Sequence, residues 1–331
     1  MDLLPLRISD PELLALLADI LAVRLDARET AKLRLRLIDA KFSWQALADL
    51  AIEQDVIYPL IWALHRRSLL LPVPNKLGRD LLADHPTIAL EAVYQRHLLR
   101  RMAQRDQLLT VIAALNGANV IPLLLKGGRY LVAPSGAWCE ARDMRDIDLL
   151  VRKNDVPRAV AALEAEGYRF ENEFVPLDQH LPELWLAGRP SVLEIHTEAL
   201  AFSARKILPT EEVWRYGIPF SIQGNAVVVL PEQWHLLHGL LNHQISDRGH
   251  LRRLLGVKAL WEFAMLGSGL SERDWRSITD HMAARAQMDV LGSFIVQATQ
   301  LFGLTYPLVA DISSTARAHA DRTFAHAARP D

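Results

Sequence analysis

The spacing of apolar and polar positions divides the chain into two helical regions around a mixed segment. Residues 1–119 and 231–303 place apolar residues three or four positions apart, which is typical of amphipathic helices. Residues 120–230 instead hold short apolar runs separated by turn residues, which predicts strands mixed with helices. The tail at 304–331 is polar and rich in alanine, arginine and histidine, and we expect it to be frayed or disordered. The predicted fold class is therefore α+β, with an N-terminal helical region, a core and a C-terminal helical region.

Start and stop signals bound the helices of the first region. Ser9-Asp10-Pro11 combines a capping residue with a proline in the first turn, and Ser43 begins a second segment. Pro59 lies inside that segment and predicts a break or a kink. A longer helix is predicted from about Thr87 to Leu115. We expect its inward-facing residues to be Leu98, Met102, Leu108, Ile112 and Leu115.

The long helix also carries four arginines, at Arg96, Arg100, Arg101 and Arg105. The favoured interpretation is a solvated helix face, on which the aliphatic stems of the side chains cover apolar surface. The alternative is a basic face that lies near a polyanionic substrate.

A mixed sheet of about five strands is predicted between residues 120 and 230. Val120–Leu125 and Asp146–Val151 are apolar runs typical of buried strands. Tyr168–Phe174 and Ser191–Thr197 are expected to form two more. A hairpin is predicted around Gln223-Gly224-Asn225, because IPFSI and AVVVL flank this turn.

Two carboxylates in the second predicted strand are the strongest chemical signal. Asp146 and Asp148 are two positions apart, so in a strand they point to the same face, with Ile147 behind them. Adjacent carboxylates repel one another and desolvate badly unless a cation lies between them. Hard oxygen ligands at this spacing suit Mg²⁺, which leaves coordination positions for phosphate oxygens. The pair therefore predicts a metal site for a phosphate-bearing substrate.

Glycines and cations upstream of this pair are candidate phosphate ligands. Gly127 and Gly128 follow a predicted strand, and their backbone N–H groups are expected to approach the phosphates. Lys126 either neutralises a phosphate or ends the strand in solvent. Arg142 and Arg145 precede the carboxylates, and each either pairs with an acid or reaches a phosphate.

The motif Lys-Gly-Gly followed by Arg-Asp-Met-Arg-Asp-Ile-Asp-Leu-Leu-Val resembles the DNA polymerase β-like nucleotidyltransferase superfamily. It is most similar to the branch of bacterial uncharacterised nucleotidyltransferases, over roughly the SWQALADLA segment to the LFG near residue 303. The resemblance implies a nucleotidyltransferase-fold core at 120–230 and a third acidic ligand at Glu194, in VLEIHTEAL. Alternation along that strand places Glu194 on one face with His196. The alternative for Glu194 is a structural pair with His196.

The resemblance also implies an activity: the transfer of a nucleoside monophosphate from an NTP such as ATP to an acceptor, with release of pyrophosphate. Asp146, Asp148 and Glu194 would be the catalytic residues and would hold two Mg²⁺ ions, with Mn²⁺ as the alternative. Glu194 or a metal-bound hydroxide would accept the proton of the nucleophile. Superfamily members also place basic residues of a C-terminal helix on the triphosphate, for which Arg252, Arg253 and Lys258 are the candidates. Gly256 stands where the branch often has an acid.

Composition narrows the class of protein. A chain of 331 residues, half of them hydrophobic, supports about two domains. The formal net charge of −2 gives no global basic field for nucleic acid. The single cysteine, Cys139, excludes an intramolecular disulfide. We expect a cytoplasmic protein, because the N-terminus lacks a signal-peptide pattern and no apolar run reaches the roughly 18 residues of a membrane span.

The sequence does not identify the acceptor, and it leaves two competing functions. A small-molecule or peptide acceptor is preferred to an RNA end. Phosphate contacts by basic residues dominate RNA affinity, and the net charge of this chain is close to neutral. The competing functions are a catalytically idle nucleotide-sensing or scaffold module and an RNA-binding protein of the same fold. A zinc site is disfavoured, since the spacing of three nearby histidines does not match helical zinc motifs. The residues in question are His235, His238, His243 and Asp247.

Overall fold

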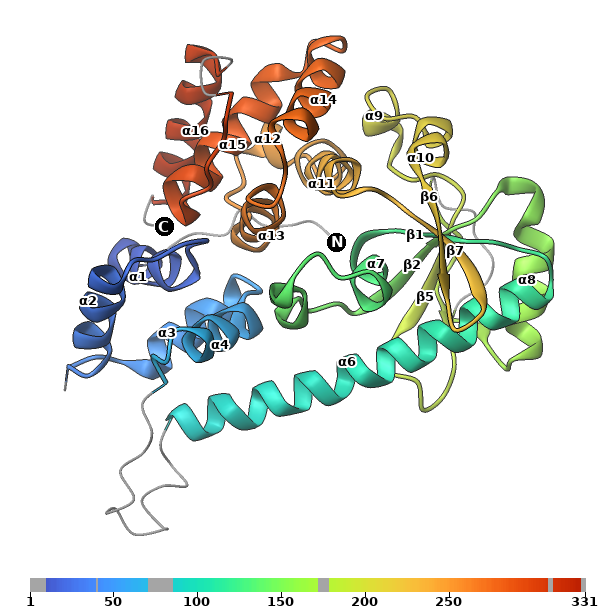
Figure 1. Cartoon of the computed structure of the whole chain (residues 1–331), viewed down its shortest axis with the longest axis horizontal. Helices are drawn as coiled ribbons and strands as arrows, with labels where there is room; N and C mark the ends of the chain where they lie inside the picture. The colour runs from blue at the N-terminus through green and yellow to red at the C-terminus, as the bar shows by residue number, and fades with distance from the viewer. Residues whose placement is uncertain (1–9, 40, 71–85, 172–178, 309–311, 329–331) are drawn as a thin grey trace. The chain divides into compact units, whose positions relative to one another are not determined.

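The computed structural model describes residues 10–39, 41–70, 86–171, 179–308 and 312–328 (Figure 1). The chain separates into two compact units. The first unit contains residues 1–98, 249–275 and 282–331, and the second contains residues 99–248 and 276–281. In the described part of the chain, no helix is both long enough and apolar enough to cross a membrane.

The first unit is helical, and its helices begin at the capping residues that the sequence indicates. The side chain of Asp10 accepts a hydrogen bond from Leu13 N at 3.0 Å, and Ser43 accepts one from Ala46 N at 3.1 Å. The complete helices are α1 (Pro11–Leu21), α2 (Ala27–Leu37), α3 (Trp44–Glu53), α4 (Ile57–Arg66), α12 (Gly249–Arg252), α13 (Val257–Gly267), α15 (Met288–Phe302) and α16 (Ser314–Ala327). Helices α6 (Pro86–Gly117) and α14 (Glu272–Ala283) cross the unit boundaries.

Three local expectations are corrected. The predicted break falls between α3 and α4, before Pro59, which lies in the first turn of α4, where a missing N–H costs nothing. Met102 is 69% exposed rather than inward-facing. The expected frayed tail contains α16, because Ser313 caps it and Ala316, Ala320 and Ala327 are buried along one side.

The second unit is built on a seven-stranded mixed sheet in the order β3-β4-β5-β2-β1-β7-β6. Strands β2 and β5 are parallel neighbours at its centre, and β1 pairs antiparallel with β2. The predicted hairpin is confirmed as β6 and β7. The strands are β1 (Leu123–Leu124), β2 (Asp146–Leu150), β3 (Arg169–Phe170), β4 (Leu184–Trp185), β5 (Val192–His196), β6 (Ile218–Ile222) and β7 (Asn225–Val229).

One face of this sheet is packed against helices, which leaves the other face for chemistry. Ile147, Leu149, Leu193 and Ile195 are fully buried in a core with α6 and α8 (Val156–Ala165), in agreement with the view in Figure 1. The long helix contributes Leu108, Ile112 and Leu115 to this core, as predicted. Because side chains alternate along a strand, the even-numbered residues of β2 and β5 point to the opposite face.

The observed architecture confirms the predicted α+β class with helices at both ends of the chain. β3 lies within the predicted strand Tyr168–Phe174, whereas β4 was not predicted. β4 spans two residues, a length at which an alternating pattern carries no signal. The last part of the predicted Tyr168–Phe174 strand falls within residues 172–178, which lie outside the described residues.

Candidate functional site

The parallel pairing of β2 with β5 brings the candidate acids together. Asp148 lies directly opposite Glu194 in the register, and Leu150 lies opposite His196. These side chains share the face of the sheet that α6 and α8 leave uncovered. The pairing therefore converts two separated sequence motifs into one cluster on the sheet.

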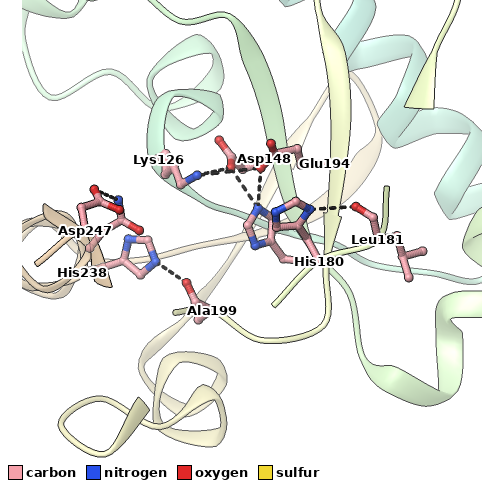
Figure 2. Close-up of polar contacts among 10 residues, drawn as sticks. Lys126, Asp148, His180, Leu181, Glu194, Ala199, His238 and Asp247 are labelled. Atoms are coloured by element: carbon pink, nitrogen blue, oxygen red, sulfur yellow. Dashed lines mark hydrogen bonds and ion pairs between the residues drawn. The ribbon is translucent and has the colours of Figure 1, made fainter. Parts of the chain in front are cut away.

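Lys126 and His196 contact the acids of this cluster, and Figure 2 draws Lys126 beside Asp148 and Glu194. Lys126 Nζ is 2.6 Å from Asp148 Oδ1 and 3.9 Å from Glu194 Oε2. His196 Nε2 is 2.9 Å from the same Asp148 oxygen and 3.2 Å from Glu194 Oε2. Figure 2 shows the Lys126 side chain directed at Asp148. In this arrangement Lys126 and His196 each have two carboxylate partners.

The side chains of this cluster are buried, and a buried charge is costly unless an opposite charge pairs with it. Asp148 and His196 are each 1% exposed. Burial alone would raise the pKa of Asp148, but the Lys126 ammonium and the His196 hydrogen bond hold that pKa well below its usual range. Burial likewise opposes a charged Lys126, but the carboxylates of Asp148 and Glu194 raise its pKa above the ordinary lysine value. Asp148 is therefore ionised and paired with a charged lysine.

Asp146 stands apart from the tight cluster. Its pKa is raised by burial and then by the negative charge of Asp148, while the positive charge of Lys126 opposes both. The side-chain ligand atoms of Asp148, Glu194 and His196 all lie within 4.8 Å of one another, and Asp146 is not part of this group. The structure thus brings two of the three predicted acids to metal-ligand spacing and places the third within electrostatic range.

The donor set of this group fits a divalent cation. Two carboxylates and an imidazole are ordinary ligands for Mn²⁺ and Zn²⁺, and the carboxylates alone suit Mg²⁺. Lys126 Nζ already shows that a positive charge is stabilised at this point. In the part of the chain that the structure describes, this is the one group of three such residues. Among the described residues, His235, His238, His243 and Asp247 do not form another such group.

The two glycines lie inside the first turn of α7 (Lys126–Val132), rather than in an open turn. Leu125 N donates to Asp148 O at 3.1 Å, which joins the start of this helix to β2. A Cβ at Gly127 would overlap Arg142 Nη1 and would lie 3.1 Å from Met144 Cβ. A Cβ at Gly128 would only contact Asp148 O at 3.7 Å. Gly127 is therefore required by packing, whereas Gly128 is not.

This difference gives a paired prediction. Gly128→Ala should stabilise the protein by roughly 0.5–1 kcal/mol, because alanine restricts the unfolded chain and fits the helix. Gly127→Ala should lose that gain and become destabilising, because Met144 and Arg142 must move. Urea unfolding of both variants measures the difference. Equal stabilities for the two variants would contradict the packing argument.

The arginines near the site act mainly on backbone carbonyls. Arg101 Nη1 donates to Arg142 O at 3.1 Å, and Arg105 Nε donates to Leu131 O at 3.1 Å. The Arg142 guanidinium donates to Asp143 O and lies 5.8 Å from the centre of the Tyr130 ring. Arg145 is exposed. Arg101 therefore holds the segment that leads into β2, and Arg105 holds the end of α7.

Two buried glutamines on α6 are site residues that sequence reasoning missed. Gln104 Nε2 donates to Met144 O and to Ser191 Oγ, both at 2.9 Å. Gln107 Nε2 donates to Ser191 O at 2.8 Å, and its Oε1 accepts from Ser191 N at 3.2 Å. These bonds tie together the chain just before β2 and just before β5. Two glutamines three positions apart on an otherwise apolar helix face were the available signal.

His238 on α11 (Glu232–Leu241) lies close to the cluster and is neutral. Its Nε2 bonds to Ala199 O at 2.8 Å, and burial lowers its pKa to about 4. The unfolded chain takes up a proton near the ordinary pKa of 6.5, whereas the folded chain does not. Above that pH both states are neutral and this histidine contributes no pH dependence.

We therefore expect folding stability to fall as the pH is lowered from about 6.5 towards 4. The contribution of His238 reaches on the order of 3 kcal/mol at the lower end of this range. Urea unfolding between pH 7 and 4.5 measures the slope for wild type and for His238→Gln. An unchanged slope in the variant would show that other groups control the loss.

The three basic residues that the resemblance suggested as triphosphate ligands belong to the first unit. Lys258 Nζ pairs with Asp55 Oδ2 at 2.6 Å within the first unit. Arg252 and Arg253 also belong to that unit and are exposed.

Comparison with known proteins supplies one match. The sequence profile of the family described as "Uncharacterised nucleotidyltransferase" matches residues 40–303. No curated protein matches the chain, and no solved structure matches it. The match covers most of both helical flanks together with the sheet that holds Asp148 and Glu194. The chain belongs to this uncharacterised nucleotidyltransferase family.

Proposed function

We propose that this protein is a metal-dependent nucleotidyltransferase of the DNA polymerase β-like superfamily, in its bacterial branch. It would transfer a nucleoside monophosphate from an NTP to an acceptor. The observation that carries the proposal is the buried pair Asp148 and Glu194, aligned on adjacent parallel strands. Family membership supports the reaction class.

The residues divide between metal and phosphate binding. Asp148 and Glu194 would hold a divalent cation, Mg²⁺ or Mn²⁺, and Asp146 at the start of β2 would help to hold a second one. The cation supplies charge stabilisation for the phosphate oxygens and the leaving group. Lys126, Gly127 and Gly128, at the start of α7, are proposed to bind the triphosphate with Arg142 and Arg145.

The reaction forms one bond and breaks one bond. An acceptor hydroxyl oxygen bonds to the α-phosphorus while the bond from that phosphorus to the pyrophosphate oxygen breaks. The acceptor proton passes to Glu194 or to solvent, and pyrophosphate leaves with its charge. Lys126 would move from Asp148 to the phosphates during this cycle, because its ammonium cannot share one carboxylate oxygen with a metal ion.

A second candidate is supported by the same lysine. Lys126 balances the charge of Asp148, and His196 bonds to both Asp148 and Glu194, so the cluster has internal partners as a structural core. A catalytically idle nucleotide-sensing or scaffold module would need nothing more. The two candidates differ in whether a divalent metal is needed for nucleotide binding.

Titration calorimetry of ATP, CTP, GTP and UTP with Mg²⁺ tests the proposal. For an enzyme we expect one NTP to bind only with metal, and Asp146→Ala/Asp148→Ala to lose this binding by at least about a hundredfold. Transfer of label from the bound NTP to an acceptor mixture then tests catalysis. Metal-independent binding, or binding that survives the double substitution, would favour the idle module.

A further inference from the structure

A short edge segment pairs with β5 beside the candidate metal cluster. In this segment His180 lies opposite His196 in a single antiparallel bridge. Residues directly opposite one another in an antiparallel pair point to the same face of the sheet. The two imidazole rings are in contact, with 5.1 Å between their centres. The His180 side chain therefore shares the face of His196, whose ring bonds to both Asp148 and Glu194.

A bulge in the edge segment turns His180 towards the site. His180 lies opposite His196, and Leu184 lies opposite Leu193, so the edge segment has one residue more than β5 between these two pairs. In a regular strand His180 and Leu184 would point to the same face. Leu184 and Leu193 are instead fully buried in the core on the other face. One extra residue is the mark of a β-bulge, which often redirects a side chain beside an active site.

Two other residues of the bulge agree with this direction. Pro182 has no N–H with which to pair, and prolines within sheets occur on edge strands and at bulges. The pKa of Glu183 is raised by burial and then by the negative charge of Glu194, so its carboxyl group also lies near the cluster. The segment from His180 to Glu183 therefore borders the site.

The ring of His180 offers one nitrogen to a substrate. Its Nδ1 lies 2.7 Å from Leu181 O, and because a carbonyl oxygen can only accept, Nδ1 is the donor. Figure 2 draws this bond beside the cluster. In the neutral ring the lone pair then lies on Nε2, which no hydrogen bond reaches in the described part of the chain. His180 is half-buried, whereas His196 is 1% exposed, so His180 is the histidine that a substrate can contact.

The order of the strands places His180 and the proposed triphosphate ligands on opposite sides of the acids. β5 pairs with β2 on one edge and with the His180 segment on the other. β1 pairs with the far edge of β2, and Lys126 begins α7 soon after β1. The acids of β2 and β5 therefore lie between Lys126 and His180. Because the attacking and leaving oxygens of phosphoryl transfer are roughly in line, an acceptor that attacks opposite the pyrophosphate enters on the His180 side.

We propose that His180 is the general base of the transfer reaction. The inference rests on the proposed nucleotidyltransferase function. The acceptor hydroxyl donates a hydrogen bond to His180 Nε2, its oxygen bonds to the α-phosphorus, and the bond from that phosphorus to the pyrophosphate oxygen breaks. The hydroxyl proton moves to Nε2, the Leu181 carbonyl stabilises the resulting imidazolium through Nδ1, and solvent then takes the proton. Histidine is the most frequent general base, and this role leaves Glu194 available as a carboxylate for the cation.

NMR of protein with isotope-labelled histidines tests the geometry without any acceptor. Long-range proton–nitrogen correlations report which ring nitrogen carries the proton, and the His180 signal is the one that disappears in His180→Gln. We expect the proton on Nδ1 and the lone pair on Nε2. Mn²⁺ with a non-hydrolysable NTP analogue should broaden this signal, and Mg²⁺ with the same analogue should not. A proton on Nε2, or no broadening by bound Mn²⁺, would overturn the proposal.

Single-turnover transfer measures the role of His180 in the reaction. An NTP labelled at the α-phosphate is mixed with enzyme, with water or glycerol as the simple hydroxyl acceptor. His180→Ala should slow product formation by about a hundredfold or more and keep its NTP affinity within about twofold of wild type. Added imidazole should restore the rate of His180→Ala by at least about tenfold, because alanine leaves space for it, but not that of His180→Gln. A loss of rate without rescue, together with weaker NTP binding, would assign His180 a structural role and overturn the proposal.

The matched control is Gln179→Ala, which changes the neighbouring side chain but keeps the bonds from Thr197 N and Glu198 N to the Gln179 carbonyl. Its rate should stay within about twofold of wild type and should not respond to imidazole. The same measurements separate this inference from the proposed function. A wild type that binds no NTP would remove both, whereas NTP binding with an unchanged transfer rate in His180→Ala would overturn only the role of His180.

Discussion

Lys126→Met is expected to lower the stability of the metal-free protein and to raise its affinity for a divalent cation. The substitution removes the ammonium 2.6 Å from Asp148, which is 1% exposed. Removing one partner of a buried ion pair typically costs about 3–5 kcal/mol. Lys126 keeps 26% of its side chain exposed, so we expect about 2–3 kcal/mol after solvent screening.

The gain in metal affinity follows from the same charges. In wild type a cation must compete with Lys126 for Asp148 and Glu194. Without the lysine, the carboxylates repel one another until a cation binds, so Mn²⁺ affinity should rise by about tenfold or more. Mn²⁺ should then restore more stability to Lys126→Met than to wild type. The affinity of Mg²⁺–ATP should fall, because the proposed triphosphate ligand is lost.

Lys153→Met is the matched control. Lys153 also pairs with a glutamate at 2.5 Å, but 68% of its side chain is exposed. Exposed pairs contribute roughly 0–1 kcal/mol, and this one lies away from the metal cluster. Titration calorimetry with Mn²⁺ measures the metal affinity of wild type, Lys126→Met and Lys153→Met, and urea unfolding measures their stability. A Mn²⁺ affinity in Lys126→Met at or below that of wild type would show that the lysine does not occupy the metal position.

Gln104→Leu is expected to weaken both folding and metal binding. Gln104 is 1% exposed, and its amide joins Met144 O to Ser191 Oγ. Leucine leaves both oxygens buried without this donor, which costs about 1–3 kcal/mol for each group. Met144 precedes β2 and Ser191 precedes β5, so the relative alignment of Asp148 and Glu194 should also loosen.

A double-mutant cycle separates this positioning role from a general loss of stability. Ser191→Ala removes one of the two acceptors, and its effect should be smaller in the Gln104→Leu background by about 0.5 kcal/mol or more. Gln95→Leu on the same helix is the control, because its bond to Glu91 is exposed. Mn²⁺ affinity should fall in Gln104→Leu and remain unchanged in Gln95→Leu. An unchanged Mn²⁺ affinity in a destabilised Gln104→Leu would limit this residue to a structural role.

Local patterns predicted the elements that carry the site. The apolar run that contains Asp146 and Asp148 predicted a buried strand, and β2 spans Asp146–Leu150. Alternation in VLEIH predicted that Glu194 and His196 share a face, and the two side chains are joined through His196 Nε2. Short-range rules succeed here because strand alternation and helix caps depend on neighbouring residues only.

Contacts between distant segments could not be predicted in this way. The pairing of Lys126 with Asp148, and of Gln104 with Ser191, depends on how α7 and α6 pack on the sheet. Lys126 has a positive φ of 41°, which no propensity rule anticipates for lysine. The two-residue strand β4 pairs with the longer β5 on one side and with β3 on the other, so both short strands depend on partners elsewhere in the chain.

The sequence by itself determined the α+β class, the strand with two aspartates and the family resemblance that the profile match supports. These properties follow from periodicity and from a contiguous motif. The tertiary structure decided which charges meet: it grouped Asp148 and Glu194 with His196 and Lys126, and it brought His180 opposite His196. The physical reason is that strand order and helix packing bring together residues far apart in the chain, and electrostatic energies depend on those distances.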